Sequence, residues 1–278
     1  MKLSFEFFPP RDDAQQAVFR AARDRLAALG PEYMSVTFGA GGSTLGRTRR
    51  TVLEIQAETG IPAAPHLSCM VESRESLDDL LDSYSAHGIQ RLVVLRGDRP
   101  SGGGHGIFDH AVDLVGYIRQ RHGDRFRIEV ACYPELHPES PDIDSELAHF
   151  EAKVRAGADA AITQYFYNAD AYFRFVDDCS RRGIDIPIVP GIMPITNYAA
   201  LARFSAACGA ELPAWIEKRI AVWDRQGRRD CLRAFGEDVV TGLCERLLAG
   251  GAPGLHFYTL NRARATLAIC RNLGLGKR

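Results

Sequence analysis

The chain has 278 residues, of which 46% are hydrophobic and 25% charged, as in an ordinary soluble globular protein. Its formal net charge of -1, with no basic run to neutralise phosphates, argues against a nucleic-acid partner. The seven cysteines are scattered and form no C-x-x-C pair, which argues against a disulfide framework or a thiolate zinc site.

The sequence favours a cytoplasmic protein that does not enter a membrane. An odd number of dispersed cysteines fits a reducing cytosol. The N-terminus leads directly into a predicted strand, without the pattern of a signal peptide. No apolar run approaches the ~18 residues that a membrane span needs.

Strand-like and helix-like segments alternate along the chain. The predicted strands cover residues 3–8, 33–38, 63–69, 91–98, 128–133, 160–166, 186–192 and 255–260. The predicted helices cover residues 15–29, 47–59, 73–87, 110–121, 145–156, 171–182 and 263–273. Residues 197–250 read as all-helical and are longer than one repeat of this alternation needs.

This alternation predicts an α/β protein with a parallel sheet. Eight strand–helix units in under 280 residues match one (β/α)8 TIM barrel over residues 1–278, with additional helices before the last strand. The competing architecture is a doubly wound open sheet.

Glu6 lies in the middle of the first predicted strand, among phenylalanines and before two prolines. Burial disfavours the charged form of a carboxyl group, so we expect the pKa of Glu6 to rise. A raised pKa would make Glu6 a general acid near neutral pH. The alternative is an edge strand whose glutamate faces water.

Polar residues recur near the C-terminal ends of successive predicted strands. They are Glu6, Thr37, His66, Asp98, Glu135 and Gln164, separated by 31, 29, 32, 37 and 29 residues. In a barrel these positions converge on the face that carries active sites, so they predict one site. The chain shows no metal-ligand spacing, no G-x-S-x-G motif and no strand-end lysine, which points to a cofactor for the harder step.

The sequence resembles the methylenetetrahydrofolate reductase family, in its bacterial single-domain form, along nearly its whole length. The motifs that carry the resemblance are SFEFFPPR (4–11), VTFGAGGST (36–44), APHLSC (64–69), LRGD (95–98), YPELHPE (133–139), KVRAGADAAITQYF (153–166), PGIMPITN (190–197) and HFYTLNR (256–262). The resemblance implies a barrel that binds FAD. It also implies reduction of 5,10-methylenetetrahydrofolate to 5-methyltetrahydrofolate by NADH or NADPH, in a ping-pong hydride relay that feeds methionine synthesis.

The resemblance also assigns site residues. Glu6 matches the general acid, and Asp98 matches a carboxylate beside flavin and pterin that stabilises a developing cation. The implied substrate-binding residues are Glu6, Asp98, Gln164, Phe204 and Arg262. The implied FAD-binding residues are Thr37, His66, Arg96, Gly97, Asp98, His110, Ala111, Tyr133, His137, Glu146 and Lys153. No metal is implied, and family members are commonly homo-oligomers.

His110 and Glu146 depart from the residues that relatives often carry, as does Ala200. Phe204 has an alternative as a core residue of an amphipathic helix. Two other functions compete: another FAD barrel oxidoreductase, such as proline dehydrogenase, and a barrel that holds folate without turnover.

Overall fold

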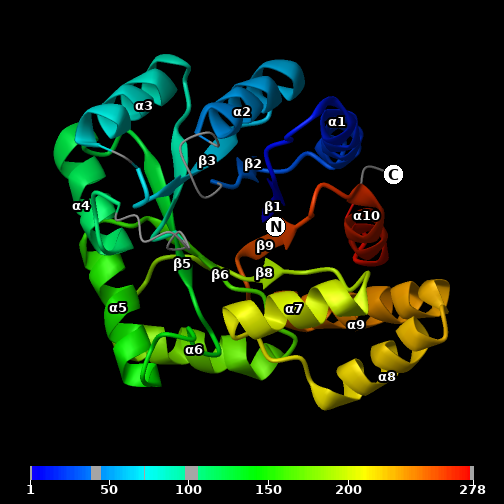
Figure 1. Cartoon of the computed structure of the whole chain (residues 1–278). Coiled ribbons are helices and arrows are strands. Elements are labelled where there is room, and N and C mark those ends of the chain that lie inside the picture. The colour runs from blue at the N-terminus through cyan, green and yellow to red at the C-terminus, as the bar shows by residue number, and fades with distance from the viewer. Residues whose placement is uncertain (1, 39–44, 72, 98–105, 276–278) are drawn as a thin grey trace.

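The computed structural model describes residues 2–38, 45–71, 73–97 and 106–275, and its strands form one parallel sheet (Figure 1). Within these residues the strand segments are β1 (Lys2–Phe7), β2 (Tyr33–Val36), β3 (Ala63–Ser68), β4 (Arg91–Leu95), β5 (Arg127–Cys132), β6 (Ala160–Thr163), β7 (Ile188–Val189), β8 (Gly191–Ile192) and β9 (Gly254–Tyr258). Their spatial order is β7-β6-β5-β4-β3-β2-β1-β9-β8. Since each strand lies beside its neighbour in the chain and the order never reverses in the middle, the predicted barrel is confirmed and the doubly wound sheet is excluded.

The seventh barrel strand is divided at Pro190. β7 pairs with β6, whereas β8 pairs with β9, so the two short segments together close the ring between β6 and β9. The sequence predicts one strand over residues 186–192. Proline has no backbone N–H to give to a ladder, which explains the division. The carbonyl of Pro190 still accepts the N–H of His256 at 3.0 Å.

Side chains connect the wall of the barrel next to this division. The N–H of Gly191 donates to Thr163 Oγ1 at 2.9 Å, and the hydroxyl of Tyr258 donates to the Thr163 carbonyl at 2.7 Å. A Cβ on residue 191 would lie 2.2 Å from that carbonyl oxygen. Glycine is therefore required at this point of the wall.

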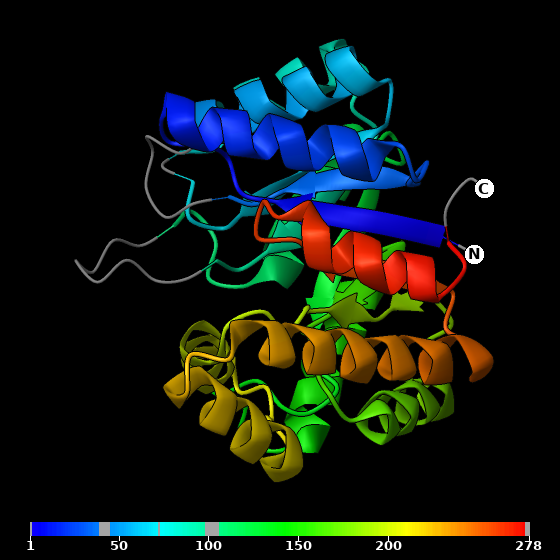
Figure 2. The same ribbon diagram turned by 90° about the vertical axis from the view of Figure 1, so that its right-hand side faces the viewer.

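Helices cover the outside of the barrel (Figures 1 and 2). Those that alternate with the strands are α1 (Asp13–Ala27), α2 (Leu45–Thr59), α3 (Arg74–Ala86), α4 (Ala111–His122), α5 (Ile143–Arg155), α6 (Ala169–Arg181) and α10 (Ala263–Asn272). The predicted additional helices before the last strand are α7 (Tyr198–Cys208), α8 (Ala214–Arg225) and α9 (Arg229–Ala249), which pack in sequence. Several helices begin at a side chain that accepts an N–H of the first turn: Asp12, Ser73, Asp142, Asn168 and Asn197.

The strands separate an apolar outer layer from a partly polar interior. In β1, Phe5 and Phe7 are fully buried, and the ring of Phe7 meets Phe19 of α1 edge-on at 5.5 Å. Since side chains alternate along a strand, Ser4 and Glu6 face the opposite side, into the barrel. A second, smaller apolar cluster consists of Tyr33, Ala64, Val93 and Ile162. The interiors of such barrels are usually filled by branched apolar residues, so the polar side chains inside this barrel indicate a functional site.

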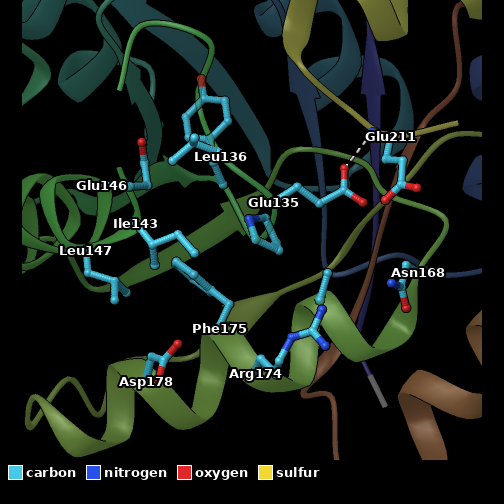
Figure 3. A pocket seen from close by; sticks show the side chains of 13 residues that line it. Glu135, Leu136, Ile143, Glu146, Leu147, Asn168, Arg174, Phe175, Asp178 and Glu211 are labelled. Atoms are coloured by element: carbon cyan, nitrogen blue, oxygen red, sulfur yellow. Dashed lines mark hydrogen bonds between the residues drawn. The ribbon is translucent and has the colours of Figure 1, made fainter. Parts of the chain in front are cut away.

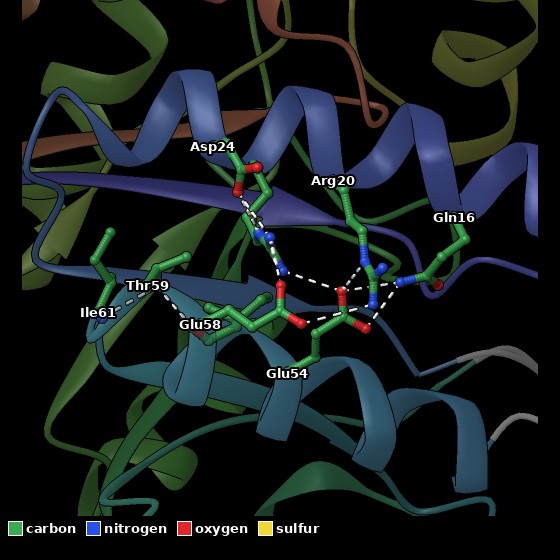
Figure 4. A network of polar contacts seen from close by, with 9 residues as sticks. Gln16, Arg20, Asp24, Glu54, Glu58, Thr59 and Ile61 are labelled. Carbon is green, nitrogen blue, oxygen red and sulfur yellow. Dashed lines mark hydrogen bonds and ion pairs between the residues drawn. The ribbon is translucent and has the colours of Figure 1, made fainter.

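An ionic network joins α1 to α2 beside β1 (Figure 4). Arg23 is only 3% exposed, and its guanidinium contacts Asp24 and Glu58 at 2.7 Å and Glu54 at 3.0 Å. Arg20 also binds Glu54, at 2.7 Å. A buried guanidinium is tolerated only when it is paired, so this network fixes the relative position of the first two helices.

Two glycines of α9 provide a matched test of this packing. A Cβ on Gly236 would lie 2.4 Å from the Ile195 carbonyl oxygen, whereas a Cβ on Gly242 meets nothing within 4 Å. Alanine favours a helix over glycine by about 0.5–1 kcal/mol. We expect Gly242→Ala to raise the free energy of unfolding by about that amount, and Gly236→Ala to lower it by about 1–3 kcal/mol, in urea titrations. Equal effects of the two substitutions would contradict the described packing of α9.

Candidate active site

A carboxylate lies between two imidazoles near the C-terminal ends of the strands. Glu6 belongs to β1, His66 to β3 and His256 to β9. Glu6 Oε2 is 3.3 Å from His66 Nε2 and 3.7 Å from His256 Nε2. The three side chains, which we call the acid–imidazole cluster, are 13%, 7% and 0% exposed in that order. Active sites of such barrels lie at this end of the strands, so the cluster is a candidate active site.

The predicted rise in the pKa of Glu6 is wrong. Burial does raise the pKa of this carboxyl group, but the two imidazoles beside it, His256 and His66, together lower it to about 2. The prediction rested on the neighbouring phenylalanines, but Phe5 and Phe7 face away from Glu6, and the two imidazoles beside it come from distant strands. At neutral pH Glu6 is therefore a carboxylate.

This pKa predicts how acid affects stability. Since the pKa of Glu6 in the folded protein lies below its ordinary value of 4.5, the carboxylate stabilises the fold above that pH. The contribution disappears as the pH falls towards 2. Between pH 5 and pH 3 we expect the wild type to lose about 2 kcal/mol more unfolding free energy than Glu6→Gln, as measured by urea unfolding. The same loss in both proteins would show that the imidazoles do not hold Glu6 in its charged form.

Four of the predicted cofactor residues follow β5. The ring of Tyr133 meets the His137 ring edge-on, with 4.7 Å between centroids. Lys153 of α5 donates to the Ala131 carbonyl at 2.6 Å, and burial lowers the pKa of its ammonium group. Glu146 is buried in the same helix. An aromatic ring and basic side chains at one strand end suit a ribose and a phosphate.

Two further predicted residues follow β4. Arg96 binds Glu139 with distances of 2.5 and 3.1 Å. Gly97 has a φ of 81°, and a Cβ there would lie 2.0 Å from Ser68 Oγ, so the turn requires glycine. Asp98, predicted both as a catalytic and as a binding residue, lies outside the described residues.

The remaining predicted cofactor residues lie at a strand end and at a helix start. Thr37 follows β2, and its N–H donates to the Phe7 carbonyl at 2.9 Å, which holds it beside β1. His110 precedes α4, and its N–H donates to Asp113 at 3.3 Å. Ala111 is the first residue of that helix. Local hydrogen bonds of the strand ends and helix caps therefore set these positions.

A cavity of about 290 Å³ lies between α5, α6 and the segment after β5 (Figure 3). Tyr133 and Glu146, both predicted cofactor residues, line it. Glu135 also lines it and accepts the N–H of Glu211 at 2.7 Å. Burial raises the pKa of Glu135, whose Oε1 has no hydrogen-bond partner among the described residues. The volume is at the lower end of ligand pockets, so the cavity has room for only one end of a dinucleotide.

The predicted substrate residues, other than Glu6 and Asp98, come from three elements. Gln164 follows β6, and its side-chain oxygen accepts the N–H of Tyr165 at 3.0 Å. Phe204 of α7 is 38% exposed, which excludes its alternative as a core residue. Arg262 is exposed at the start of α10, directly after β9. Gln164 thus lies just beyond the C-terminal end of β6, as strand-end spacing predicted, and Arg262 lies beyond the C-terminal end of β9.

Sequence reasoning missed His256 and its partner Ser4. Ser4 Oγ lies 2.7 Å from His256 Nδ1, and both side chains are buried. The predicted site residues are polar residues at strand ends, whereas Ser4 and His256 lie in the middle of β1 and β9. The signal was a polar residue alternating with apolar ones in strands that were otherwise predicted to be buried.

The described residues contain no cluster of three or more His, Cys, Asp or Glu side chains arranged to hold a metal ion. In the same part of the chain, none of the helices combines the length and hydrophobicity of a membrane span. All seven cysteines are free thiols.

The parallel strands thus form a (β/α)8 barrel that carries the acid–imidazole cluster at the end where active sites of such barrels lie, as in barrel enzymes. The family model described as "Methylenetetrahydrofolate reductase" matches residues 1–274. The chain therefore belongs to the methylenetetrahydrofolate reductase family, which consists of oxidoreductases.

Curated relatives agree with this membership. The chain is 38% identical over 275 residues to the 5,10-methylenetetrahydrofolate reductase of Pectobacterium carotovorum, covering 99% of this chain and 91% of the relative. The Escherichia coli enzyme of the same name is 37% identical with the same coverage. A methylenetetrahydrofolate reductase (NADH) of Arabidopsis thaliana is 39% identical, but this chain covers only 48% of its length.

Solved structures of low identity share the fold. A Clostridium thermocellum protein described as binding two copies of 5-methyl-5,6,7,8-tetrahydrofolic acid has a TM-score of 0.65 at 15% identity, over 98% of this chain and 93% of that one. Dihydropteroate synthase of Xanthomonas albilineans has a TM-score of 0.53 at 14% identity, over 98% and 92%.

Proposed function

We propose that this protein reduces 5,10-methylenetetrahydrofolate to 5-methyltetrahydrofolate, with FAD as cofactor and NADH or NADPH as hydride donor. The observation that carries the proposal is the acid–imidazole cluster at the active-site end of the barrel, in a chain of this family. The names of the relatives support the substrate. Family membership also argues against a proline dehydrogenase.

The described residues fit a dinucleotide cofactor. Tyr133 and Glu146 line the cavity beyond β5. The unpartnered Oε1 of Glu135 in that cavity is a further group that a ligand could satisfy. We propose that Thr37, His66, Arg96, Gly97, Asp98, His110, Ala111, Tyr133, His137, Glu146 and Lys153 hold FAD. When bound, FAD supplies hydride transfer in two half-reactions, first with nicotinamide and then with folate.

The protein's own contribution is the delivery of a proton. Opening the five-membered ring of methylenetetrahydrofolate requires protonation of the departing nitrogen. Because its pKa is about 2, the carboxyl group of Glu6 carries no proton of its own at neutral pH. We propose that an imidazole of the cluster, His66 or His256, holds the proton and transfers it to the Glu6 carboxylate, and that Glu6 then gives this proton to the departing nitrogen of the substrate. This relay keeps Glu6 as the catalytic contact to the substrate.

Other residues would bind the folate and balance its charge. The amide of Gln164 has a donor and an acceptor, which suit a pterin edge. We propose that Phe204 covers the substrate and that Arg262 pairs with a carboxylate of the folate tail. Asp98 would stabilise the cation that forms on ring opening. We further propose that residues 1–278 act as one catalytic domain, in a cytoplasmic homo-oligomer that supplies methyl groups for methionine synthesis.

The half-reactions separate this function from its alternatives. Purified protein should be yellow, should bleach with NADH or NADPH under anaerobic conditions, and should regain colour with methylenetetrahydrofolate. Glu6→Gln should retain flavin and its reduction by nicotinamide within about twofold, but lose about 10²-fold or more of the folate half-reaction, because only ring opening needs the proton.

Stopped-flow absorbance of the flavin measures both steps, and Glu151→Gln on the outer helix α5 is a control with the same chemical change. A colourless protein that still binds folate would favour a folate carrier over the proposed reductase. Normal rates of both half-reactions in Glu6→Gln would remove Glu6 from the mechanism.

A further inference from the structure

Helix α7, which carries Phe204, buries little of its own surface. Of its 11 residues only Leu201 and Ser205 are buried, one turn apart on the same face. Phe204 lies beside that face and is 38% exposed. Apolar contacts have no preferred direction, so one buried leucine does not fix how the helix is turned about its axis. A directional contact is needed to hold Phe204 at a set position.

A hydrogen bond to the barrel supplies this direction. The Ser205 Oγ atom lies 3.0 Å from the hydroxyl oxygen of Tyr165, and we call these two groups the hydroxyl pair. Tyr165 is 3% and Ser205 6% exposed, so water does not replace the contact. Burial raises the pKa of Tyr165, so the phenol keeps its proton. The hydroxyl pair therefore joins α7 to the segment directly after β6.

Tyr165 is itself held by the barrel strands. Its N–H donates to the side-chain oxygen of Gln164 at 3.0 Å, and the N–H of Gln164 donates to the Cys132 carbonyl of β5 at 2.8 Å. The ring of Tyr165 meets the Tyr258 ring edge-on at 6.5 Å, and the Tyr258 hydroxyl donates to the Thr163 carbonyl at 2.7 Å. Because β5, β6 and β9 all hold this segment, the phenol of Tyr165 is a fixed attachment point for α7.

The C-terminal end of α7 rests on the segment after β5. Gly209, which ends the helix, has a φ of 75°, and a Cβ there would lie 3.0 Å from the Leu136 carbonyl oxygen. Two residues later, the N–H of Glu211 donates to the Glu135 carboxylate at 2.7 Å (Figure 3). These contacts limit the shift of that end of the helix and leave its rotation to the hydroxyl pair.

We infer that the hydroxyl pair positions Phe204 relative to Gln164, which makes Tyr165 and Ser205 positioning residues for folate binding. Tyr165 follows Gln164 in the chain and Ser205 follows Phe204, so a single hydrogen bond links the neighbours of two proposed substrate residues. The effect on folate rests on the proposed function, whereas the attachment of α7 does not.

Steady-state kinetics of the FAD-loaded enzyme test the role in binding. Tyr165→Phe removes the hydroxyl and keeps the ring. It should raise the KM for methylenetetrahydrofolate about fivefold or more, with kcat within about twofold, because the lost contact serves binding rather than chemistry. Ser205→Ala should have the same effect, and the double variant no larger one, since the two hydroxyls form one contact. An unchanged KM in Tyr165→Phe, or two effects that add, would overturn the inference.

Tyr172→Phe on α6 is the matched control. It also removes a buried phenol hydroxyl, which donates to the Ile188 carbonyl at 2.8 Å, and should leave the folate KM within about twofold of the wild type. A rise equal to that in Tyr165→Phe would reduce the hydroxyl pair to general stability and overturn its positioning role.

A second cycle asks whether the hydroxyl pair acts through Phe204. In a Phe204→Ala background, Tyr165→Phe should raise the folate KM no further, because the side chain that it positions is already gone. A further rise of about fivefold in that background would show that Tyr165 acts by another route, against the inference.

Hydrogen exchange measured by mass spectrometry reports on α7 without turnover. In FAD-loaded Tyr165→Phe, the amides of residues 201–208 should exchange about fivefold faster than in the wild type, while those of α5 exchange at the same rate. Unchanged α5 shows that the variant is folded. Equal exchange of α7 in both proteins would show that the hydroxyl pair does not hold the helix, and the inference would fail.

The two readouts separate this inference from the proposed function. If Tyr165→Phe speeds exchange in α7 but the wild type reduces no methylenetetrahydrofolate, the proposed function fails and the attachment of α7 stands. If both proteins reduce folate with the same KM, the proposed function stands and this inference fails.

Discussion

Two carboxylates inside one barrel are the constraint on which this structure depends. An unpaired charge in a protein interior costs far more than a fold can spare, so Glu6 and Glu129 each require cationic or donating neighbours. Glu6 has two imidazoles, and Glu129 has an arginine and a phenol. Those partners come from four further strands, β2, β3, β4 and β9, so satisfying the two charges also fixes how the strands are arranged around the interior.

Under the proposed function, the same pairing explains how Glu6 can deliver a proton although the pKa of its carboxyl group is low. In an apolar setting Glu6 would carry its own proton, and its charge would change on reaction. Between imidazoles the carboxylate charge is held by the site, and the proton can move over a short distance within the cluster. Rigid strands carry the proton-transfer groups, while the predicted cofactor and substrate residues mostly lie just beyond strand ends and on the helices that follow. This arrangement separates proton delivery from binding.

The sequence allowed the architecture to be predicted because hydrophobic periodicity is local information. Alternating strands and helices gave the barrel, and the extra helices before β9 followed from the length of residues 197–250. The convergence of Glu6 and His66 could also be predicted from strand-end spacing. The low pKa of Glu6 could not, because it depends on His256, which is 250 positions away in the chain. The division of β7 from β8 depended similarly on how Pro190 meets its neighbours.

Tyr258 stabilises the barrel wall beside the acid–imidazole cluster. Its ring contacts that of His256, and its hydroxyl donates a hydrogen bond to the Thr163 carbonyl, across the strand that Pro190 divides. Burial and the nearby charge of Glu6 raise the pKa of Tyr258 well above its ordinary value, so this phenol keeps its proton. The hydroxyl of Tyr258 therefore links β9 to β6 where Pro190 interrupts the strand between them. The same hydrogen bond and the raised pKa keep this phenol from acting as a second acid beside the acid–imidazole cluster.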